Sequence, residues 1–377
     1  MNHQPDLSGD EFRSARHLSR FEPHSTDSST IIAGMGTAVP PYRLPQELAL
    51  DVVRSMFGSH FPDFAKRSKL FETAGIDNRY SAVPPEWFRQ EHTIGDRNAQ
   101  YMRAATSLFI DAAQNALDDA GLMAEEVDIV VTVSSTGIAT PTLEALAMQE
   151  MGFSTHAKRI PVFGLGCAGG VSGLSIASQL ARANPDATVL LVAVELCTLS
   201  FRKDNPGKAA LVASALFGDG AAAVCLQSST HSVPGDVIVG DGVEHTWEGT
   251  LDIMGWDVED QGLGVIFDRS IPDFVSSHFR EAADQALARL DIDIDDVTRF
   301  ICHPGGAKVL TALESALELD TQTLDHERAI LHEFGNMSAP TALFVLQRAI
   351  RHEAEGDYLL AALGPGFTAS FLKLEIK

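Results

Sequence analysis

Residues 163 to 170 of the chain read Phe163-Gly164-Leu165-Gly166-Cys167-Ala168-Gly169-Gly170. A strand-like segment over 160–163 leads into this stretch, and an apolar pattern at helical spacing follows it to about residue 183. A thiol at the N-terminus of a helix lies at the positive end of the helix dipole, which favours the thiolate. A small buried hydrophobe is the structural alternative for any cysteine. The glycines around Cys167, however, indicate the close approach of a ligand or of another backbone.

Strand-like and helix-like segments alternate on both sides of Cys167. In the first half, the apolar pattern predicts helices over 105–116 and 141–152 and strands over 128–133, 188–196 and 221–226. In the second half, it predicts helices over 274–290, from 305 and over 341–350, and strands over 298–302, 358–363 and 371–376. We therefore expect an α/β protein of two similar halves, 31–235 and 236–377, after a flexible tail over 1–30.

The composition disfavours several classes of partner. The 377 residues carry a formal net charge of −23, which argues against nucleic acid or an anionic membrane surface. The longest fully apolar run, 189–194, is far shorter than the roughly 20 residues that span a bilayer, so no membrane span is expected. The 4 cysteines form no CxxC pair, so we expect a cytoplasmic location with neither a disulfide framework nor a metal site.

Two further residues have the chemistry that a nucleophilic thiol needs. His303 ends a strand-like segment and opens His303-Pro304-Gly305-Gly306, where a structural cap is the alternative role. Asn336 precedes a helix in Gly335-Asn336-Met337-Ser338, where N-capping is the alternative role. A histidine can pair with a thiolate, and an amide N–H can stabilise negative charge on a substrate oxygen. Together with Cys167, these residues predict covalent catalysis.

The order of these motifs resembles that of type III polyketide synthases, the chalcone synthase-like family, over roughly residues 31–377. The segment from Leu211 to Ala223, LVASALFGDGAAA, resembles the family segment with a gatekeeper phenylalanine, here Phe217. The segment Gly364-Pro365-Gly366-Phe367 resembles the family's C-terminal GPG loop, which places Gly366 and Phe367 at the substrate pocket. The resemblance implies the thiolase fold, a duplicated αβαβα arrangement of five layers, and a homodimer that needs no metal or organic cofactor.

The resemblance also implies a role for each catalytic residue. Cys167 would attack a starter acyl-CoA and hold the acyl group, with His303 paired to the thiolate. Malonyl-CoA would then lose carbon dioxide while His303 and Asn336 donate hydrogen bonds to the thioester oxygen. An aspartate in place of Asn336 would repel the resulting enolate. Phe217 would give the departing carboxylate an apolar wall, and plain core packing is its alternative role.

CoA thioesters are anionic, so basic residues are expected near the site in spite of the net negative charge. The densest basic cluster in the first hundred residues consists of Arg54, Lys66, Arg67 and Lys69. By the resemblance, Lys66 and Lys69 match family lysines that bind CoA phosphates, whereas a third family lysine is replaced by Thr73. Gly305 and Lys308, which follow His303, are the other expected CoA contacts.

The expected pocket residues depart from plant chalcone synthases in one direction. Cys197 and Ser200 stand in place of two threonines, and Val265 stands where a second gatekeeper phenylalanine is expected. The smaller Val265 would open the entrance, and bacterial relatives with a cysteine at the position of Cys197 tend to take long aliphatic starters. The resemblance therefore favours a long-chain acyl-CoA and an alkylpyrone or alkylresorcinol product. The other expected pocket residues are Ser135, Thr136 and Ser338, near the cyclising chain, and Thr140, which would reach the partner subunit's pocket.

Other functions fit part of this pattern. A β-ketoacyl-ACP synthase III-like enzyme shares the fold and the Cys-His-Asn chemistry but takes its malonyl group from a carrier protein. A thiolase-fold protein that only binds or scaffolds partners is a second alternative, although all three catalytic residue types are present. A papain-like hydrolase uses the same residue types in the same order, but its disulfides are not expected here.

Overall fold

The computed structural model describes residues 29–229, 237–352 and 355–377. Its main feature is a nine-stranded sheet in the order β11-β12-β13-β8-β1-β7-β6-β4-β5. The strands are β1 (Ser29–Ala38), β4 (Val127–Val133), β5 (Lys158–Val162), β6 (Thr188–Leu196), β7 (Asp219–Ser229), β8 (Val237–Thr246), β11 (Val297–Cys302), β12 (Gly356–Gly364) and β13 (Thr368–Ile376). Two small antiparallel pairs join β2 (Tyr42–Arg43) to β3 (Tyr80–Ser81) and β9 (Met254–Glu259) to β10 (Gly262–Phe267).

The large sheet consists of two halves with the same pairing pattern. In the N-terminal half, β4 pairs with β6 in parallel, and β6, β7 and β1 follow as antiparallel neighbours. In the C-terminal half, β11 pairs with β12 in parallel, and β12, β13 and β8 follow as antiparallel neighbours. The two halves meet where β1 pairs with β8. This repetition confirms the duplicated α/β architecture that the sequence predicted.

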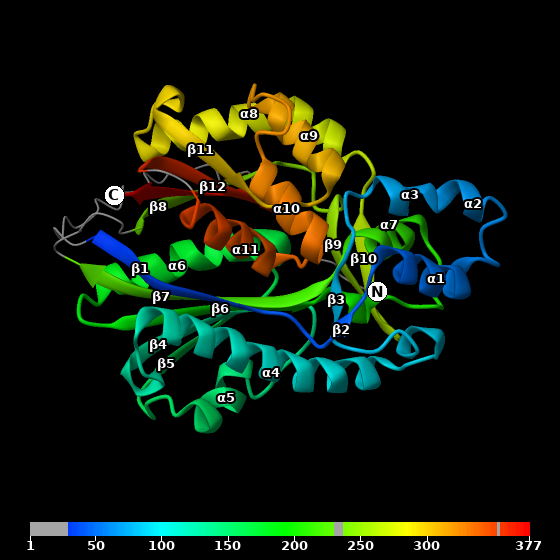
Figure 1. Ribbon diagram of the computed structural model, residues 1–377, viewed down its shortest axis with the longest axis horizontal. Helices are drawn as coiled ribbons and strands as arrows, with labels where there is room; N and C mark the ends of the chain where they lie inside the picture. Colours follow the sequence, from blue (N-terminus) through cyan, green and yellow to red (C-terminus); the bar gives the residue numbers. More distant parts are fainter. Residues whose placement is uncertain (1–28, 230–236, 353–354) are drawn as a thin grey trace, which may run out of the picture.

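Helices complete a five-layer stack, which is seen edge-on in Figure 1. One outer layer contains α4 (Ile94–Ala120) and α5 (Leu143–Met151), and the central layer contains α6 (Gly169–Ala183) and α11 (Ala339–Ile350). The other outer layer contains α8 (Ile271–Leu290) and α9 (Ala307–Ala316), and α10 (Asp325–Phe334) packs on α9 and α11. One end of the stack carries α1 (Gln46–Phe57), α2 (Phe64–Arg67), α3 (Lys69–Thr73), α7 (Lys208–Leu216) and the β9–β10 hairpin.

Local sequence explains the two ends of α4 and the positions of β6 and β5 in the sheet. Helix α4 starts at a capping box formed by Thr93 and Asp96, and it ends at Gly121, which adopts a left-handed conformation. Strand β6 is an unbroken apolar run apart from Thr188 and Glu195, and it is buried along its whole length. Strand β5 forms the edge of the sheet and exposes charged side chains and a proline, as edge strands do.

The expected N-terminal tail and the expected domain boundary lie at or beyond the limits of the described residues. Ser29 and Thr30, which we expected in the tail, belong to β1. The rest of the expected tail and the expected boundary at residue 235 lie outside the described residues. In the described part of the chain, no helix is long and apolar enough to cross a membrane.

Candidate active site

Cys167 lies in a short 3-10 turn, Gly166–Ala168, that runs directly into α6. The glycines of this stretch allow neighbouring backbone and the GPG loop to pack on the turn. Gly166 has a φ of 49°, and a Cβ at this position would lie 2.7 Å from Cδ of Pro365. A Cβ at Gly170 would lie 2.3 Å from the carbonyl oxygen of Ala339 at the start of α11. The glycines therefore serve the approach of other parts of the chain to the nucleophile.

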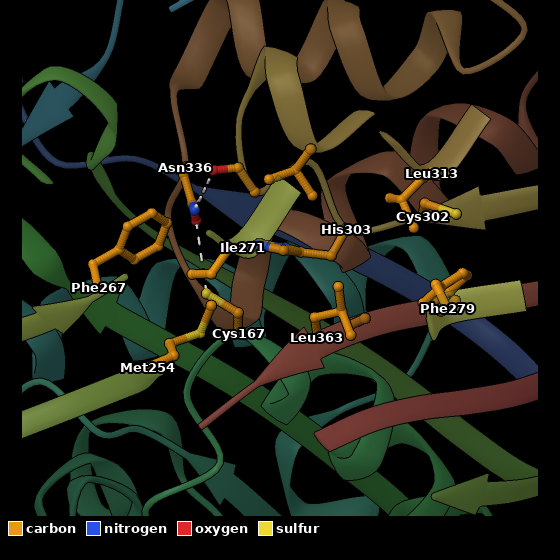
Figure 2. Close-up of a pocket in the computed structure, with 14 residues that line it drawn as sticks. Cys167, Met254, Phe267, Ile271, Phe279, Cys302, His303, Leu313, Asn336 and Leu363 are labelled. Carbon is orange, nitrogen blue, oxygen red and sulfur yellow. Dashed lines mark hydrogen bonds between the residues drawn. The ribbon is translucent and has the colours of Figure 1, made fainter. Parts of the chain in front are cut away.

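His303 follows the last residue of β11, where its main-chain N–H donates to the carbonyl of Ala361, 2.8 Å away. The side chain is only 5% exposed, and neither ring nitrogen has a hydrogen-bond partner among the described residues. Figure 2 shows the ring extending from the strand end toward the side of the cavity where Cys167 and Asn336 lie. Both ring nitrogens of His303 are thus available to a substrate.

Asn336 is held in place through both its main chain and its side chain. Its N–H donates to Leu216 O and its carbonyl accepts from Gly218 N, both at 2.9 Å. Its side-chain oxygen accepts from Ser338 N at 2.8 Å, and its Nδ2 donates to Gly305 O at 3.2 Å. Ser338, at the N-cap of α11, has a φ of 59°, a strained conformation for a residue with a side chain. Ser338 occupies the N-cap position without a side-chain cap hydrogen bond, and Asn336, two residues before it, lines the cavity.

The three residues line one small cavity of about 20 Å³ between α8, α9 and the end of the C-terminal half-sheet (Figure 2). The Sγ of Cys167 lies 4.0 Å from Oδ1 of Asn336. The remaining walls are largely apolar and consist of Met254, Phe267, Ile271, Phe279, Cys302, Gly305, Val309, Leu313, Ala361, Ala362 and Leu363. Cys302, the last residue of β11, is also part of the cavity wall.

Burial sets the protonation of the catalytic pair in the empty site. It raises the pKa of the Cys167 thiol to about 11 and lowers the pKa of His303 to about 3. Desolvation is the largest influence on Cys167, so its resting form is the thiol and not the thiolate that a helix N-terminus alone favours. Glu195, which is fully buried on β6, adds to this effect once it is ionised above its own raised pKa of about 8.

A larger cavity of about 500 Å³ adjoins the first and shares Phe267, Gly305 and Val309 with it. Its polar lining contains four cationic side chains, Arg67, Lys208, Arg269 and Lys308, and one acidic side chain, Asp268. Gly305 and Lys308, which the sequence analysis expected to contact CoA, both line this cavity, and Thr73 is also part of the wall.

Lys66 and Lys69, the expected CoA-phosphate contacts, do not line this cavity, and their role in binding CoA stays a prediction. Helices α2 and α3 turn Arg67, Leu70 and Thr73 toward the cavity at a spacing of three residues. Lys66 and Lys69 occupy the adjacent, exposed face. Arg67 pairs with Asp63 at 2.6 Å, so part of its charge is already balanced. Lys208 and Arg269, which the sequence analysis missed, bring two further cations to the cavity, and no local motif marks either of them.

The β9–β10 hairpin supplies an aromatic wall at Phe267, a residue that the sequence analysis did not single out. Val265 lines neither cavity, whereas Phe267, two residues further along the same face of β10, lines both. Its ring meets edge-on that of Phe217, which itself lines neither cavity, with centroids 6.3 Å apart. Val265 itself pairs across the hairpin with Trp256, so a bulky side chain lies opposite the small one. That Val265 widens the entrance stays a prediction.

Eight other expected pocket residues lie around the catalytic residues but line neither cavity. Ser135 Oγ accepts from Gly164 N at 3.0 Å, Thr136 Oγ1 accepts from Leu196 N at 2.8 Å, and Ser200 Oγ donates to Cys197 O at 2.7 Å. Ser135 thus holds the turn before Cys167, and Thr136 and Ser200 hold the turn that follows β6. Phe367 is fully buried against Trp247 and Phe274. The eight residues are Ser135, Thr136, Thr140, Cys197, Ser200, Ser338, Gly366 and Phe367.

A metal site requires several His, Cys, Asp or Glu side chains that converge on one point. Over the described ranges, no group of three or more His, Cys, Asp and Glu side chains is arranged to hold one. All four cysteines are free thiols.

Comparison with known proteins identifies the family. The chain matches the N-terminal domain model of the chalcone and stilbene synthases over residues 19–230 and the C-terminal domain model over residues 247–374. It is 36% identical to 1,3,6,8-tetrahydroxynaphthalene synthase of Streptomyces peucetius over 353 residues, which cover 92% of this chain and 93% of that protein. It is 27% identical to an α-pyrone synthesis polyketide synthase-like protein of Mycobacterium tuberculosis, with 95% and 94% covered.

A solved structure gives the same result. The crystal structure of 1,3,6,8-tetrahydroxynaphthalene synthase from Streptomyces coelicolor, a bacterial type III polyketide synthase, matches with a TM-score of 0.85 and 30% identity. The match covers 92% of this chain and 99% of that one. These matches favour a condensing enzyme over the papain-like hydrolase and the scaffold protein considered above. The chain therefore belongs to the chalcone and stilbene synthase family and is a type III polyketide synthase.

Proposed function

We propose that the enzyme loads a starter acyl-CoA onto Cys167 and extends it by decarboxylative condensation with malonyl-CoA. The observation that carries this proposal is the convergence of Cys167, His303 and Asn336 on one apolar cavity. A thiol supplies the nucleophile, an unpartnered imidazole moves the proton, and an amide N–H stabilises negative charge. The basic outer cavity adjoins this site, as delivery of an anionic thioester requires.

In the loading step, the sulfur of Cys167 attacks the thioester carbon of the starter while its proton passes to His303. The C–S bond to CoA then breaks, and the CoA sulfur takes the proton back from His303. Because both Cys167 and His303 are uncharged in the empty site, charge separates only while the bonds change. Free CoA leaves, and the acyl group remains as a thioester on Cys167.

In the extension step, the bond between the malonyl methylene and its carboxylate breaks, and its electron pair forms an enolate as carbon dioxide leaves. The thioester oxygen becomes negatively charged, and N–H groups of Asn336 and His303 stabilise it. The enolate carbon attacks the acyl thioester on Cys167, whose sulfur leaves and recovers a proton. Phe267, which lines both cavities, gives the carboxylate an apolar wall that disfavours it relative to neutral carbon dioxide, and Phe217, a bridge partner of Asn336, packs edge-on against Phe267.

The outer cavity is the proposed site of the CoA nucleotide. Lys208, Arg269 and Lys308 are exposed cations on three different elements around it, and Arg67 adds a fourth positive charge. Against a net charge of −23, this local cluster is a focused site for phosphate groups.

For the starter, we propose a long-chain aliphatic acyl group, and for the product an alkylpyrone or alkylresorcinol. The supporting features are Cys197, from the family resemblance, and the aliphatic wall of the inner cavity, which includes Ile271, Leu313 and Leu363. Relatives differ in their products, since the proteins matched above are named for a tetrahydroxynaphthalene and for α-pyrones. A panel of aromatic and aliphatic acyl-CoA starters, with chromatography of the products, tests this choice. Faster turnover of aromatic starters would contradict it.

We also propose that the enzyme is a homodimer joined along β5. The outer edge of this terminal strand has no strand partner within the described chain. Beside it, Phe163 is 66% exposed and Ile138 is 63% exposed, on loops joined by the hydrogen bond from Gly164 N to Ser135 Oγ. Exposed apolar groups beside an open strand edge favour pairing with a second copy. Thr140, which is exposed on the same loop as Ile138, would then face the partner subunit.

No step above calls for a metal or an organic cofactor, and we propose that the enzyme uses none. Dialysis against EDTA should therefore leave turnover unchanged. A cytoplasmic location stays a prediction.

The central test is intact-protein mass spectrometry after incubation with acyl-CoA alone. Wild-type enzyme should gain the mass of one acyl group, and Cys167→Ala should gain none. Cys225→Ala is the matched control, because Cys225 is buried in β7 away from both cavities and should not be needed for loading. Acylation of Cys167→Ala to the wild-type extent would overturn the proposed covalent mechanism.

A further inference from the structure

Arg79 is a fully buried charged side chain close to the catalytic residues. It lies between α3 and β3 with no exposed surface, and it lines neither cavity. Burial lowers the pKa of its guanidinium to about 9, so the group stays protonated at neutral pH. Its nearby opposite charge is Asp219, the first residue of β7. A buried cation is costly unless it is well bonded, so its bonds indicate what it holds in place.

The guanidinium binds the carbonyl groups at the C-terminal end of α7. Nη1 donates to Ser214 O at 2.7 Å and to Phe217 O at 3.0 Å, and Nη2 donates to Ala215 O at 2.9 Å. Nη2 also donates to the side-chain oxygen of Gln46. The last carbonyls of a helix have no partner within the helix, and a cation there also interacts favourably with the helix dipole. Arg79 therefore caps α7 from the side.

The same helix end is bonded to the main chain of Asn336. Asn336 N donates to Leu216 O, which is the α7 carbonyl that Arg79 leaves free, and Gly218 N donates to Asn336 O. Phe217 and Asn336 thus lie side by side as bridge partners. Arg79 and Asn336 together satisfy the carbonyls from residue 214 to residue 217.

The stem of Arg79 also packs where the two chain segments cross. A Cβ placed on Gly218 would lie 3.1 Å from Cβ of Arg79, and one placed on Gly335 would lie 3.4 Å from it. These glycines follow Phe217 and precede Asn336. The arginine therefore contacts the backbone on both sides of the Phe217–Asn336 pair, although it touches no substrate cavity.

We propose that Arg79 is the positioning residue that sets Asn336 and Phe217 in register for decarboxylation of the extender. The inference rests on the proposed function, because it assigns these two residues to the extension step. Cys167 and His303 are positioned by other elements, the α6 turn and the end of β11. Loss of the Arg79 bonds should therefore impair decarboxylation selectively and spare the loading of Cys167.

The experiment measures both half-reactions in the same protein. Decarboxylation of malonyl-CoA is followed as carbon dioxide release, and loading is followed as the rate of acyl-mass gain on Cys167. Arg79→Lys keeps the charge, but a single ammonium cannot reproduce the forked contacts of a guanidinium. We expect decarboxylation to fall about 10- to 100-fold, as displacement of a catalytic group by an ångström can cause, while the loading rate stays within about twofold of wild type.

Arg328→Lys is the matched control. Arg328 forms a partly buried hydrogen-bonded ion pair with Glu314 at 2.6 Å, but it lines neither cavity. Arg328→Lys should leave both the decarboxylation rate and the loading rate unchanged. Gln46→Met is a milder second variant, since it removes one acceptor of Arg79 and keeps the arginine. It should show the same selective loss to a smaller extent, and it keeps the proposal testable if Arg79→Lys fails to fold.

Two results would overturn the inference. One is an equal loss of both half-reactions in Gln46→Met and in folded Arg79→Lys, because general destabilisation lowers both rates together. The other is an unchanged decarboxylation rate in these variants. A wild-type enzyme that neither loads acyl groups nor decarboxylates malonyl-CoA would overturn the proposed function instead, so the two failures are distinguishable.

Discussion

Replacing Asn336 with aspartate tests whether the site needs an uncharged side chain at this position or only a side chain of this shape. The substitution exchanges an NH₂ group for an oxygen in a side chain that is 1% exposed. The hydrogen bond from Ser338 N can persist, because it is accepted by Oδ1. The contact with Gly305 O, now a hydrogen bond of 3.2 Å, becomes a contact between two oxygens unless the new carboxyl is protonated.

The expected loss in rate follows from the distance between the side chain of residue 336 and the sulfur of Cys167. Oδ1 of Asn336 lies 4.0 Å from Sγ of Cys167, so a carboxylate there would lie at a similar distance from negative charge formed at the sulfur or on the enolate. Two like charges about 4 Å apart repel by about 4 kcal/mol at an effective dielectric constant of about 20. This repulsion corresponds to roughly a thousandfold loss in rate relative to a neutral side chain that donates no bond.

The loss should depend on pH in a definite direction. Burial raises the pKa of a carboxyl group, so at low pH the introduced carboxyl is neutral and can donate to Gly305 O much as the amide does. As the pH rises through this elevated pKa, the group ionises and repels the enolate. Asn336→Asp should therefore match or exceed Asn336→Ala at low pH and fall below it at high pH.

The assay is malonyl-CoA decarboxylation by wild type, Asn336→Asp and Asn336→Ala from about pH 6 to about pH 9. Thermal unfolding followed by circular dichroism serves as the folding control for all three proteins, because the same repulsion would also slow acyl loading at Cys167. If Asn336→Asp and Asn336→Ala have the same rate at every pH, the repulsion argument is wrong, and the amide acts through its shape alone.

Three further predictions concern the surroundings of the site. Burial raises the pKa of Glu195 to about 8, and the negative charge of ionised Glu195 raises the pKa of Cys167. Above pH 8, Glu195→Gln should therefore speed alkylation of Cys167 by iodoacetamide, measured by mass spectrometry. An equal or slower reaction would refute this coupling. We expect Arg269→Gln and Lys308→Gln each to raise the KM for acyl-CoA roughly two- to fivefold, because exposed ion pairs contribute little binding energy. The KM for the N-acetylcysteamine thioester, which has no phosphates, should not change. Equal shifts in KM for both substrates would exclude phosphate contacts. Phe163→Asp should yield monomers by light scattering after size-exclusion chromatography, and an unchanged dimer would place the interface elsewhere.

The positions of the catalytic residues could be predicted because each one follows a strong local signal. The strands that end at 162 and 302 and the helices that begin at 169 and 339 are marked by short runs rich in β-branched residues or by glycine and proline. A chemically distinctive side chain at each such junction stands out in the sequence. The motif order then identified the family, which the comparisons confirm.

The walls of the cavities could not be predicted in the same way. Val265 and Phe267 lie on the same face of β10, so periodicity cannot tell which of the two meets the substrate. Lys66 and Arg67 are neighbours in sequence, yet only Arg67 lines the outer cavity, because two short helices set which face turns inward.

The sequence by itself predicted the duplicated α/β architecture, which the structure confirms, and the proposed nucleophile with its two proposed partners, because hydrophobic period and residue chemistry are local properties. Only the tertiary structure decided the charge state of Cys167 and His303, since desolvation depends on everything packed around them. It alone brought Arg79 to α7 and Asn336, through hydrogen bonds between residues more than a hundred positions apart along the chain. Such contacts leave no periodic pattern, because a buried guanidinium is specified by the carbonyl groups that surround it and not by its neighbours in sequence.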